Sequence, residues 1–372
     1  MTTPRDPART AGPVLVVGTG LLGTSIGLGL RNLHVDVLVA DPSPSTLALA
    51  VDLGAGRPAD TEPDADVRLV VVAAPPDVTA DVVAARLAAH PRAVVTDVAS
   101  VKAPVLQALR ASGADLTRYV GGHPMAGRER SGPVAGRADL FAGRPWVVCE
   151  GEAAARAAVT DLALDLGAVP VRMDAAAHDE AVALVSHLPQ LASSLVAARL
   201  REAPEHALAL AGQGLHDVTR IAASDPALWV QILAANAAPV AAVLRELRDD
   251  LAAVLDALDA LAVAQDGQAP TPGARAVIAS AVSAGNDGVA RVPGKHGSAP
   301  TTYAVVTVVV PDRPGQLGRL FSDVGEIGVN LEDLHLEHSP GQPVGIAELS
   351  VLPPAREHLE HSLAARGWTV HG

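Results

Sequence analysis

The sequence is poor in several residue types, and each shortage excludes a class of protein. Only one of its 372 residues is a cysteine, Cys149, so neither an internal disulfide nor a cage of cysteine metal ligands is expected. The 28 Lys and Arg are outnumbered by 41 Asp and Glu, and the net charge of −13 argues against a nucleic-acid-binding surface. No apolar run reaches the roughly 20 residues that a membrane span requires, and the first residues lack the apolar core of a signal peptide. These absences predict a soluble, cytoplasmic protein without a metal site.

The residues that are present indicate several domains with aliphatic cores. Apolar residues make up 49% of the chain but aromatic residues only 2%, and the length is typical of two to three domains. Residues 1–12 are predicted to be a disordered lead. Residues 13–172 alternate helical stretches with short β-branched runs such as "VLVVG", "VDVLVAD" and "VRLVVVAAP". Such runs are typical of parallel strands buried on both faces, so this part is predicted to be a doubly wound α/β domain of the Rossmann type.

The rest of the chain changes its pattern twice. Residues 173–264 have helical spacing throughout and are apolar on several faces, which predicts an all-α domain that packs against a second copy in a homodimer. Residues 265–300 are rich in Gly, Pro, Ala and Ser and are predicted to be a linker with one helix at 273–284. In residues 301–372 the predicted order is βαββαβ, a ferredoxin-like unit.

A glycine motif follows the first predicted strand. Gly18, Gly20 and Gly23 form GxGxxG between a strand and a helix, and Asp41 ends the second strand. These glycines allow a pyrophosphate to approach the backbone at the helix start (Leu21 and Leu22), and Asp41 would bind the ribose hydroxyls. The motif predicts dinucleotide binding, with NAD favoured over NADP; a purely structural glycine turn is the alternative.

Polar residues and prolines stand where two further strands end. Ala74 and Pro75 are placed at the nicotinamide edge, although a plain strand-terminating turn would have the same sequence. Asp97 and Ser100 follow the next strand, where ligands of open α/β sheets bind, but both types also cap helices. For Lys102, taken alone, a surface charge at a helix start is the favoured interpretation.

The segment "GGHPMAGRERSG", residues 121–132, combines glycines with titratable side chains. We interpret it as an active-site loop in which His123 removes a hydroxyl proton while a hydride leaves the same carbon. Glu129 is placed to orient His123 or to close the site. A solvated surface turn is the alternative.

The helical part holds two polar clusters. His187 and Gln190 flank Pro189, but neither a histidine nor a carboxylate stands at i+3 or i+4 from His187, which argues against a metal site there. Residues 211–232 include Asp217, Arg220 and Trp229. We expect Arg220 to bind a substrate carboxylate in bidentate fashion; pairing with a neighbouring Asp to join two helices is the alternative.

In this order the motifs resemble those of the prephenate/arogenate dehydrogenases of tyrosine biosynthesis. The resemblance covers nearly the whole chain and rests on "GTGLLGTSIGLGL", "TDVASVK", "GGHPMAGRERSG", "VSHLPQ" and "DVTRIAASDPALW". It implies that His123 accepts a hydrogen bond from the substrate 4-hydroxyl, that Ser100 holds both in position and that Glu129 gates access. It also implies an NAD site and a substrate site whose members are as follows: Gly18, Gly20, Leu21, Leu22, Gly23, Asp41, Ala74, Pro75 and Asp97 for NAD, and Arg220, His187, Gln190, Asp217 and Trp229 for the substrate.

Two departures from the family pattern keep the substrate open. Gln190 stands where the family often has histidine, and His216 stands where Arg or Lys is common. Both substrates therefore stay open, with prephenate, which would give 4-hydroxyphenylpyruvate, CO2 and NADH, placed ahead of arogenate.

The last region resembles an ACT domain, a sensor of small molecules. The resemblance implies an effector site for tyrosine or another aromatic amino acid that includes Asp312, Pro314, Gly315, Leu317 and Asn330. A structural or dimerising module is the alternative.

Two other functions stay open for the whole chain. A β-hydroxyacid dehydrogenase would commonly use a lysine of the helical domain, and none occurs between Lys102 and Lys295. A sensor that binds NAD and an amino acid without turnover would have no need of His123, Ser100 and Arg220 together.

Overall fold

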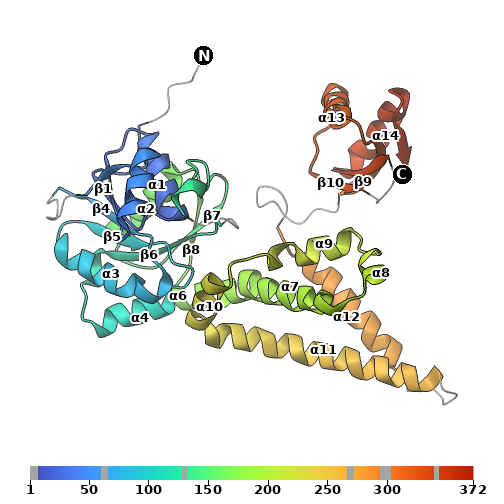
Figure 1. Ribbon diagram of the computed structural model, residues 1–372, viewed down its shortest axis with the longest axis horizontal. Helices are drawn as coiled ribbons and strands as arrows, with labels where there is room; N and C mark the ends of the chain where they lie inside the picture. The colour runs from blue at the N-terminus through green and yellow to red at the C-terminus, as the bar shows by residue number, and fades with distance from the viewer. Residues whose placement is uncertain are drawn as a thin grey trace. The chain divides into compact units, whose positions relative to one another are not determined.

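The computed structural model describes residues 7–59, 66–127, 132–265, 272–293, 303–338 and 343–371. The chain divides into two compact units, residues 1–249 and residues 250–372. Figure 1 shows the elements of each unit in chain order.

An eight-stranded sheet is the framework of the first unit. Its strand order is β3-β2-β1-β4-β5-β6-β7-β8, and all neighbours are parallel except β6 and β7. The chain reverses its winding between β1 and β4, which is where such sheets bind dinucleotides. The strands are β1 (Val14–Val17), β2 (Val37–Ala40), β3 (Arg57–Pro58), β4 (Leu69–Val72), β5 (Val94–Asp97), β6 (Tyr119–Pro124), β7 (Pro145–Val148) and β8 (Val169–Arg172).

Helices cover both faces of this sheet, as the continuous apolar strands predict. One core joins the sheet to α1 (Leu21–Arg31), α2 (Pro44–Asp52) and α5 (Ala153–Asp165). A second core joins the opposite face to α3 (Pro76–Ala89) and α4 (Ala103–Ala111). The predicted Rossmann-type architecture is therefore confirmed for this part of the chain.

Two local expectations are wrong. The predicted lead is ordered from residue 7 onward, because the backbone amides of Arg9 and Thr10 donate to the Asp165 carboxylate at 3.1 and 2.7 Å; residues 1–6 lie outside the described chain. The segment that was expected to be a loop begins as strand β6, whose residue His123 is in register with Val147 of β7.

The first unit continues as helices after β8. The first of them contains a π-helical turn, η3, directly before Pro189. The elements are α6 (Ala175–Val182), η3 (Ala183–His187), α7 (Leu188–Arg199), α8 (Glu205–Leu208), α9 (Gln213–Thr219), η5 (Arg220–Ala222), α10 (Pro226–Ala235) and α11 (Ala237–Gln265), of which α11 ends in the second unit.

One helical run in the described chain is long and apolar enough to cross a membrane by length and composition, residues 175–202. It also carries the polar side chains of His178, Asp179, His187 and Gln190, all of them buried against the rest of the unit. Ionisable side chains of this kind are costly in hydrocarbon. The run therefore has the composition of a helix that packs within a protein.

The second unit contains a four-stranded antiparallel sheet in the order β10-β11-β9-β12. Alternate residues of β9 (Ala304–Pro311) and β11 (Val344–Val351) pack against α13 (Gln316–Ile327) and α14 (Arg356–Ala365) to form a separate core. With β10 (Asp333–His338) and β12 (Thr369–His371), this arrangement confirms the predicted βαββαβ order. The expected linker contains a longer helix than predicted, α12 (Ala274–Val289).

Candidate active site

The glycine loop between β1 and α1 is shaped by close backbone contacts. Gly18 has φ +95°, and a Cβ added to it would lie 2.3 Å from the carbonyl oxygen of Ala73, just after β4. A Cβ on Gly23 would lie 1.9 Å from the carbonyl oxygen of Gly18. Only glycine fits these two positions, which bring the loop against the segment of Ala74 and Pro75. Two of the predicted cofactor segments are therefore adjacent.

The same loop leaves one side open for an anion. A Cβ on Gly20 would meet nothing within 4 Å, and within the described chain no side chain caps α1 at this residue. The first amides of α1, at Leu21, Leu22 and Gly23, therefore form an uncapped helix N-terminus, which favours a phosphate.

Asp41 lies beside this N-terminus with a fixed carboxylate. Its Oδ2 accepts hydrogen bonds from the amide and the hydroxyl of Thr19 at 2.7 and 3.0 Å, and its Oδ1 accepts from the amide of Ser43 at 2.9 Å. An acid held at this place fits the ribose hydroxyls of a dinucleotide. The loop and Asp41 thus fit NAD as the sequence predicted.

His123 lies at the carboxyl end of β6, the sheet edge to which β1, β4 and β5 also point. Its Nδ1 is 2.8 Å from Nε2 of His178 on α6, and the two rings meet edge to face with centroids 5.1 Å apart. The Nδ1 of His178 is in turn 2.7 Å from Oδ1 of Asp179. In the described chain Nε2 of His123 has no hydrogen-bond partner, so this nitrogen is available to a ligand.

Asp179 joins the helical segment to the α/β sheet. Its carboxylate accepts hydrogen bonds from the amides of Lys102 and Ala103 at the start of α4, at 2.8 and 2.9 Å. A carboxylate at this position satisfies two amides that would otherwise lack partners at the helix start. Asp179 is 3% exposed, so this cap is shielded from water.

Lys102 is not the surface charge that the sequence favoured. It is 1% exposed, and its Nζ donates to Asp97 Oδ1 and, at 2.7 Å, to the carbonyl oxygen of Gly122 beside His123. Asp97 also accepts hydrogen bonds from the Tyr119 hydroxyl at 2.7 Å and from the Ala99 amide at 2.9 Å. A buried lysine needs such a partner because an unpaired charge is costly to desolvate.

The same geometry changes the role of Asp97. Its side chain is fully buried and both carboxylate oxygens are occupied by the protein. Asp97 therefore anchors β6 through Lys102, and its contact with the cofactor stays a prediction.

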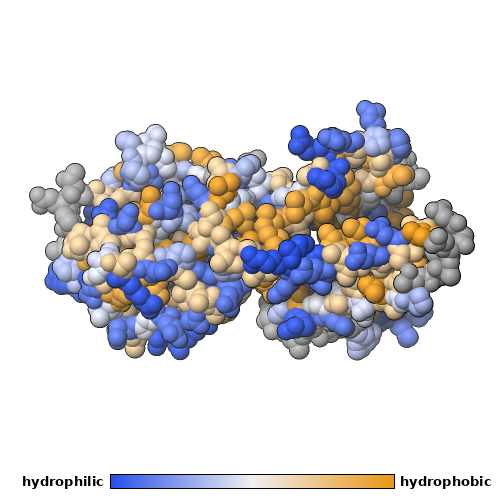
Figure 2. Space-filling model, turned by 90° about the horizontal axis from the view of Figure 1, so that it is seen from below, coloured by the Kyte–Doolittle hydropathy of each residue, from blue (hydrophilic) through white to orange (hydrophobic). Residues whose placement is uncertain are grey.

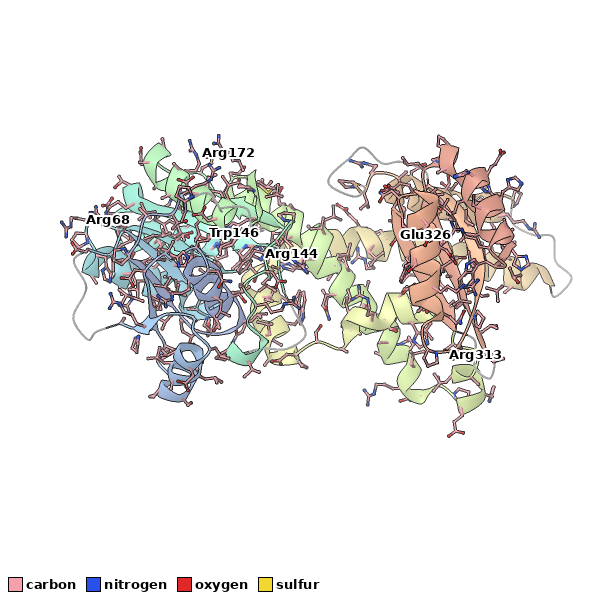
Figure 3. All side chains as sticks on the ribbon, turned by 90° about the horizontal axis from the view of Figure 1, so that it is seen from above. Arg68, Arg144, Trp146, Arg172, Arg313 and Glu326 are labelled. Atoms are coloured by element: carbon pink, nitrogen blue, oxygen red, sulfur yellow. The ribbon has the colours of Figure 1, made fainter. Side chains whose placement is uncertain are left out.

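The glycines before His123 serve the packing of β6. A Cβ on Gly122 would lie 2.9 Å from the carbonyl oxygen of Asp97 and 3.1 Å from Nε1 of Trp146. Trp146, labelled in Figure 3, is fully buried in the sheet domain. Glycine at this position thus lets β6 approach β5 and Trp146, and it places His123 on a strand.

The environment of His123 favours its neutral form. Burial lowers the pKa of His123 well below 6.5, and the nearby His178, Lys102 and His187 lower it further. Burial also lowers the pKa of His187, although Asp179 acts in the opposite direction. His123 is therefore an unprotonated base at neutral pH.

His187, a predicted substrate residue at the end of η3, has defined partners. Nδ1 of His187 is 3.2 Å from Nδ2 of Asn236, which donates to the backbone oxygen of Asp179 at 2.8 Å. The ring of His187 also contacts Trp229 edge to face, with centroids 6.0 Å apart. His187, Trp229 and the His178–Asp179 pair therefore belong to one connected group.

Gln190 lies between two serines. Its Oε1 accepts a hydrogen bond from Ser224 at 3.3 Å, and its Nε2 donates to Ser194 at 3.3 Å. Gln190 thus ties α7 to the segment that follows η5.

Arg220 and Asp217 lie on exposed parts of η5 and α9. In the described residues no carboxylate pairs with Arg220, whereas Asp217 accepts a hydrogen bond from Gln213 at 2.9 Å. The alternative of a helix-joining ion pair is therefore not observed, and the guanidinium is open to a ligand.

Among the residues it describes, the structure shows no partner for the other two predicted catalytic residues, Ser100 and Glu129, for different reasons. Ser100 is partly buried in the turn between β5 and α4, and no hydrogen bond of its hydroxyl is found in the described part of the chain. Glu129 lies outside the described residues. In the residues that the structure covers, no group of three or more side chains could hold a metal ion.

Sequence reasoning gave no role to His178, Asp179 and Asn236. They lie far along the chain from the partners that give them meaning, 55 residues between His178 and His123. A usable signal was the adjacent pair His178–Asp179 in the first turns of α6, because a carboxylate bonded to one ring nitrogen of a histidine sets which nitrogen carries the proton.

Comparison with known proteins agrees with the site. Residues 26–172 match the family model described as the nucleotide-binding domain of prephenate dehydrogenase, and residues 174–268 match that of its dimerization domain. The Streptomyces niveus protein named "Probable prephenate dehydrogenase NovF" is 42% identical over 362 residues, which cover 96% of this chain and 99% of that protein. A cyclohexadienyl dehydrogenase of Zymomonas mobilis is 30% identical, over 68% of this chain and 89% of its own.

A solved structure adds a ligand-bound relative. Aquifex aeolicus prephenate dehydrogenase, in complex with hydroxyphenyl propionate and NAD+, matches with a TM-score of 0.61 and 27% identity, over 67% of this chain and 91% of its own. Taken with the two domain matches, these similarities show that the chain belongs to the prephenate dehydrogenase family.

Proposed function

We propose that this protein catalyses the NAD-dependent oxidative decarboxylation of prephenate to 4-hydroxyphenylpyruvate and CO2, with His123 as the base. The observation that carries the role of His123 is its free Nε2, on a neutral ring at the same carboxyl edge of the sheet at which the glycine loop follows β1. Family membership supports the reaction, and the relative from Aquifex aeolicus binds NAD+ together with a phenolic ligand.

One set of residues binds the cofactor, and another binds the substrate and accepts its proton. The first amides of α1 hold the pyrophosphate and Asp41 the ribose, and the nicotinamide, when bound, supplies a hydride acceptor. His123 takes the proton of the substrate 4-hydroxyl as the hydride leaves the same carbon. Arg220 holds the ring carboxylate until it departs as CO2, a step that the gain of aromaticity drives forward.

One assay tests this proposal directly. Purified protein with NAD+ and prephenate should form NADH, followed by its absorbance, and the absence of turnover with both prephenate and arogenate would refute the reaction. The His123→Asn variant should lose about 10²- to 10⁴-fold in kcat, the range of general base catalysis, while its affinity for NADH is unchanged. A wild-type rate for this variant would refute the role of His123.

Arogenate is the second candidate substrate, and Gln190 is the observation behind it. Its amide is neutral and already paired with Ser224 and Ser194, so it offers no fixed charge to the substrate side chain. Comparing kcat/KM for prephenate and arogenate in the same assay decides between the two.

We also propose that the second unit is an ACT-type sensor for an aromatic amino acid. A hollow of about 330 Å³ is lined by Asp312, Pro314, Gly315 and Leu317, and by Arg313, which Figure 3 labels. The predicted Asn330 does not line it and donates to Glu332 at 2.8 Å. If added tyrosine leaves both the rate and the thermal stability unchanged, the proposal of a tyrosine sensor fails.

The helical segment is proposed to form a homodimer. It exposes large apolar side chains, including Leu184 (55%), Val185 (63%) and Leu195 (60%), and its family model describes a dimerization domain. Figure 2 shows apolar side chains gathered on the surface of the helical part. A dimer mass in solution, and a monomer mass for Val185→Glu with Leu195→Glu, are the expected results.

A further inference from the structure

Three side chains in a row connect the proposed base to a buried carboxylate. His178 is fully buried and Asp179 is 3% exposed, so both side chains are shielded from solvent. The distances along the row are 2.8 Å from His123 to His178 and 2.7 Å from His178 to Asp179. Because each is a hydrogen-bond distance, every nitrogen in the row must be either donor or acceptor.

Asp179 determines which atom donates and which accepts in each hydrogen bond of the row. Its two carboxylate oxygens already accept the amide N–H groups of the α4 start, Oδ1 from Lys102 and Oδ2 from Ala103, so both oxygens act as acceptors. His178 must therefore donate from Nδ1, which leaves its Nε2 as an acceptor in the neutral ring. His123 must then donate from its own Nδ1, and its Nε2 is left with a free lone pair.

This result runs against the preference of histidine in water, where the neutral ring carries its proton mainly on Nε2. A His123 free to choose would more often present an N–H, and not a lone pair, to a substrate hydroxyl. We propose that His178 and Asp179 are positioning residues that hold the proton of His123 on Nδ1 and so keep Nε2 as the base. The inference rests on the proposed role of His123, and it assigns the orientation of that base to the helical segment.

The same row also stabilises the charge that catalysis creates. When His123 takes the substrate proton on Nε2, its Nδ1–H remains bonded to Nε2 of His178, whose own Nδ1 is held by the Asp179 carboxylate. The other charged groups around the row are Lys102, His187 and Asp97, and Lys102 and His187 both oppose a cation on His123. The hydrogen bond that Nδ1–H of the His123 imidazolium donates to Nε2 of His178 is thus the contact that offsets this repulsion.

Nitrogen NMR tests the inference because the positions of the protons are read from the wild-type protein, in which the row is intact. In protein that contains ¹⁵N-labelled histidine, ¹H–¹⁵N correlation spectra through two-bond couplings, recorded above pH 6.5, show which ring nitrogen of each histidine carries the proton. Comparison with spectra of His123→Asn and His178→Gln assigns the two relevant signals among the 13 histidines. We expect both rings in the Nδ1–H form, and a proton on Nε2 of His123 would overturn the inference.

A pair of variants of similar size separates orientation from packing. His178→Gln keeps a carbonyl that can accept the Nδ1–H of His123, whereas His178→Leu fills the space without an acceptor. We expect His178→Leu to lose about 10²- to 10⁴-fold in kcat, since a wrong imidazole tautomer in a catalytic triad costs about 10⁴. His178→Gln should stay within about tenfold of the wild type, and KM for prephenate should change little in both.

The outcomes of these experiments are distinct. Equal losses of kcat in the two variants, or a wild-type kcat in His178→Leu, would contradict an orienting role, and if His178→Leu fails to fold the NMR result alone decides. A wild-type rate in His123→Asn would remove the proposed base and leave the tautomers unaffected. A proton on Nε2 of His123 would remove the inference even if His123→Asn is inactive.

Discussion

Replacing Gly20 by alanine should weaken the binding of NAD and leave the fold intact. The backbone of Gly20 has φ −69°, which alanine adopts readily, and its Cβ would meet no protein atom within 4 Å. As a helix cap, alanine is about 0.5–1 kcal/mol worse than glycine, but alanine also reduces the entropy of the unfolded chain by a similar amount, about 0.4–1 kcal/mol. The free energy of unfolding without cofactor should therefore change by less than about 1 kcal/mol.

The effect on the cofactor is larger, because the added methyl group occupies the open side of the loop. A hydrogen bond from a backbone amide to a charged acceptor is worth about 1.5–3 kcal/mol. Displacing the pyrophosphate enough to lose one such bond raises the Kd of NADH by about 10- to 150-fold. Titration of NADH fluorescence measures this Kd, and thermal unfolding in the absence of NADH measures the stability.

Gly23→Ala is the matched control. Its Cβ would lie 1.9 Å from the carbonyl oxygen of Gly18, so the backbone has to move and the unfolding temperature should fall even without cofactor. If Gly20→Ala binds NADH as tightly as the wild type, the pyrophosphate does not pass over Gly20 and the assigned cofactor site is wrong. If Gly20→Ala lowers the stability as much as Gly23→Ala does, the space beside Gly20 is not open as described.

Four further changes have expected outcomes. Arg220→Ala should raise KM for prephenate with a smaller change in kcat, and an unchanged KM in steady-state assays would contradict its role as the carboxylate anchor. Lys102→Met leaves a buried carboxylate unpaired and should cost about 3–5 kcal/mol in urea unfolding, whereas Arg137→Met removes an exposed, solvent-screened pair and should leave the stability almost unchanged. The pKa of His123 is below 6.5 in the folded protein, so its contribution to the free energy of unfolding is complete above pH 6.5 and is lost as the pH falls through the folded pKa. For the same reason the acid limb of the pH profile of kcat/KM should lie below pH 6.5. An acid limb above pH 6.5 would argue against His123 as the base. Gln190→His should change the ratio of kcat/KM between prephenate and arogenate, and a constant ratio would show that Gln190 does not select the substrate.

The cofactor side of the site could be predicted from the sequence because its determinants are local. The strand that begins at Val14, the glycines after it and Asp41 at the end of the next strand follow each other within 28 residues. Gly18 and Gly23 are required by contacts of a few atoms within the same loop and the neighbouring strand end. Patterns of this kind are preserved in the order of the residues, and so is the βαββαβ order of the second unit.

Strand β6 could not be predicted because its residues do not favour a strand by themselves. Glycine and proline are poor strand formers, and "GGHP" contains three of them. Its conformation comes from pairing with β5 on one side and β7 on the other, since Gly121 is in register with Asp97 and Gly122 with Val148. The position of His123 therefore depends on strands that are distant in the chain.

The burial of Lys102 and the roles of His178 and Asp179 were hidden for a related reason. A lysine at a helix start is ordinarily exposed, and here the decisive partners are Asp97 and the backbone of Gly122. The meaning of Asp179 likewise depends on the amides of α4, 76 and 77 residues before it. Such contacts are set by the packing of α6 against α4, which no local pattern encodes.

Because Asp179 caps α4, the two domains that the family models match are separate in the sequence but not in the structure. The nucleotide-binding match ends at residue 172, and the carboxylate that completes its fourth helix lies seven residues beyond. A fragment that stops at residue 172 would expose the amides of Lys102 and Ala103 and leave His123 without its partner ring. A chimera that receives the nucleotide-binding domain of a relative is therefore expected to fold only when α6 is transferred with it. The part of the chain that can be exchanged as one structural piece ends after that helix.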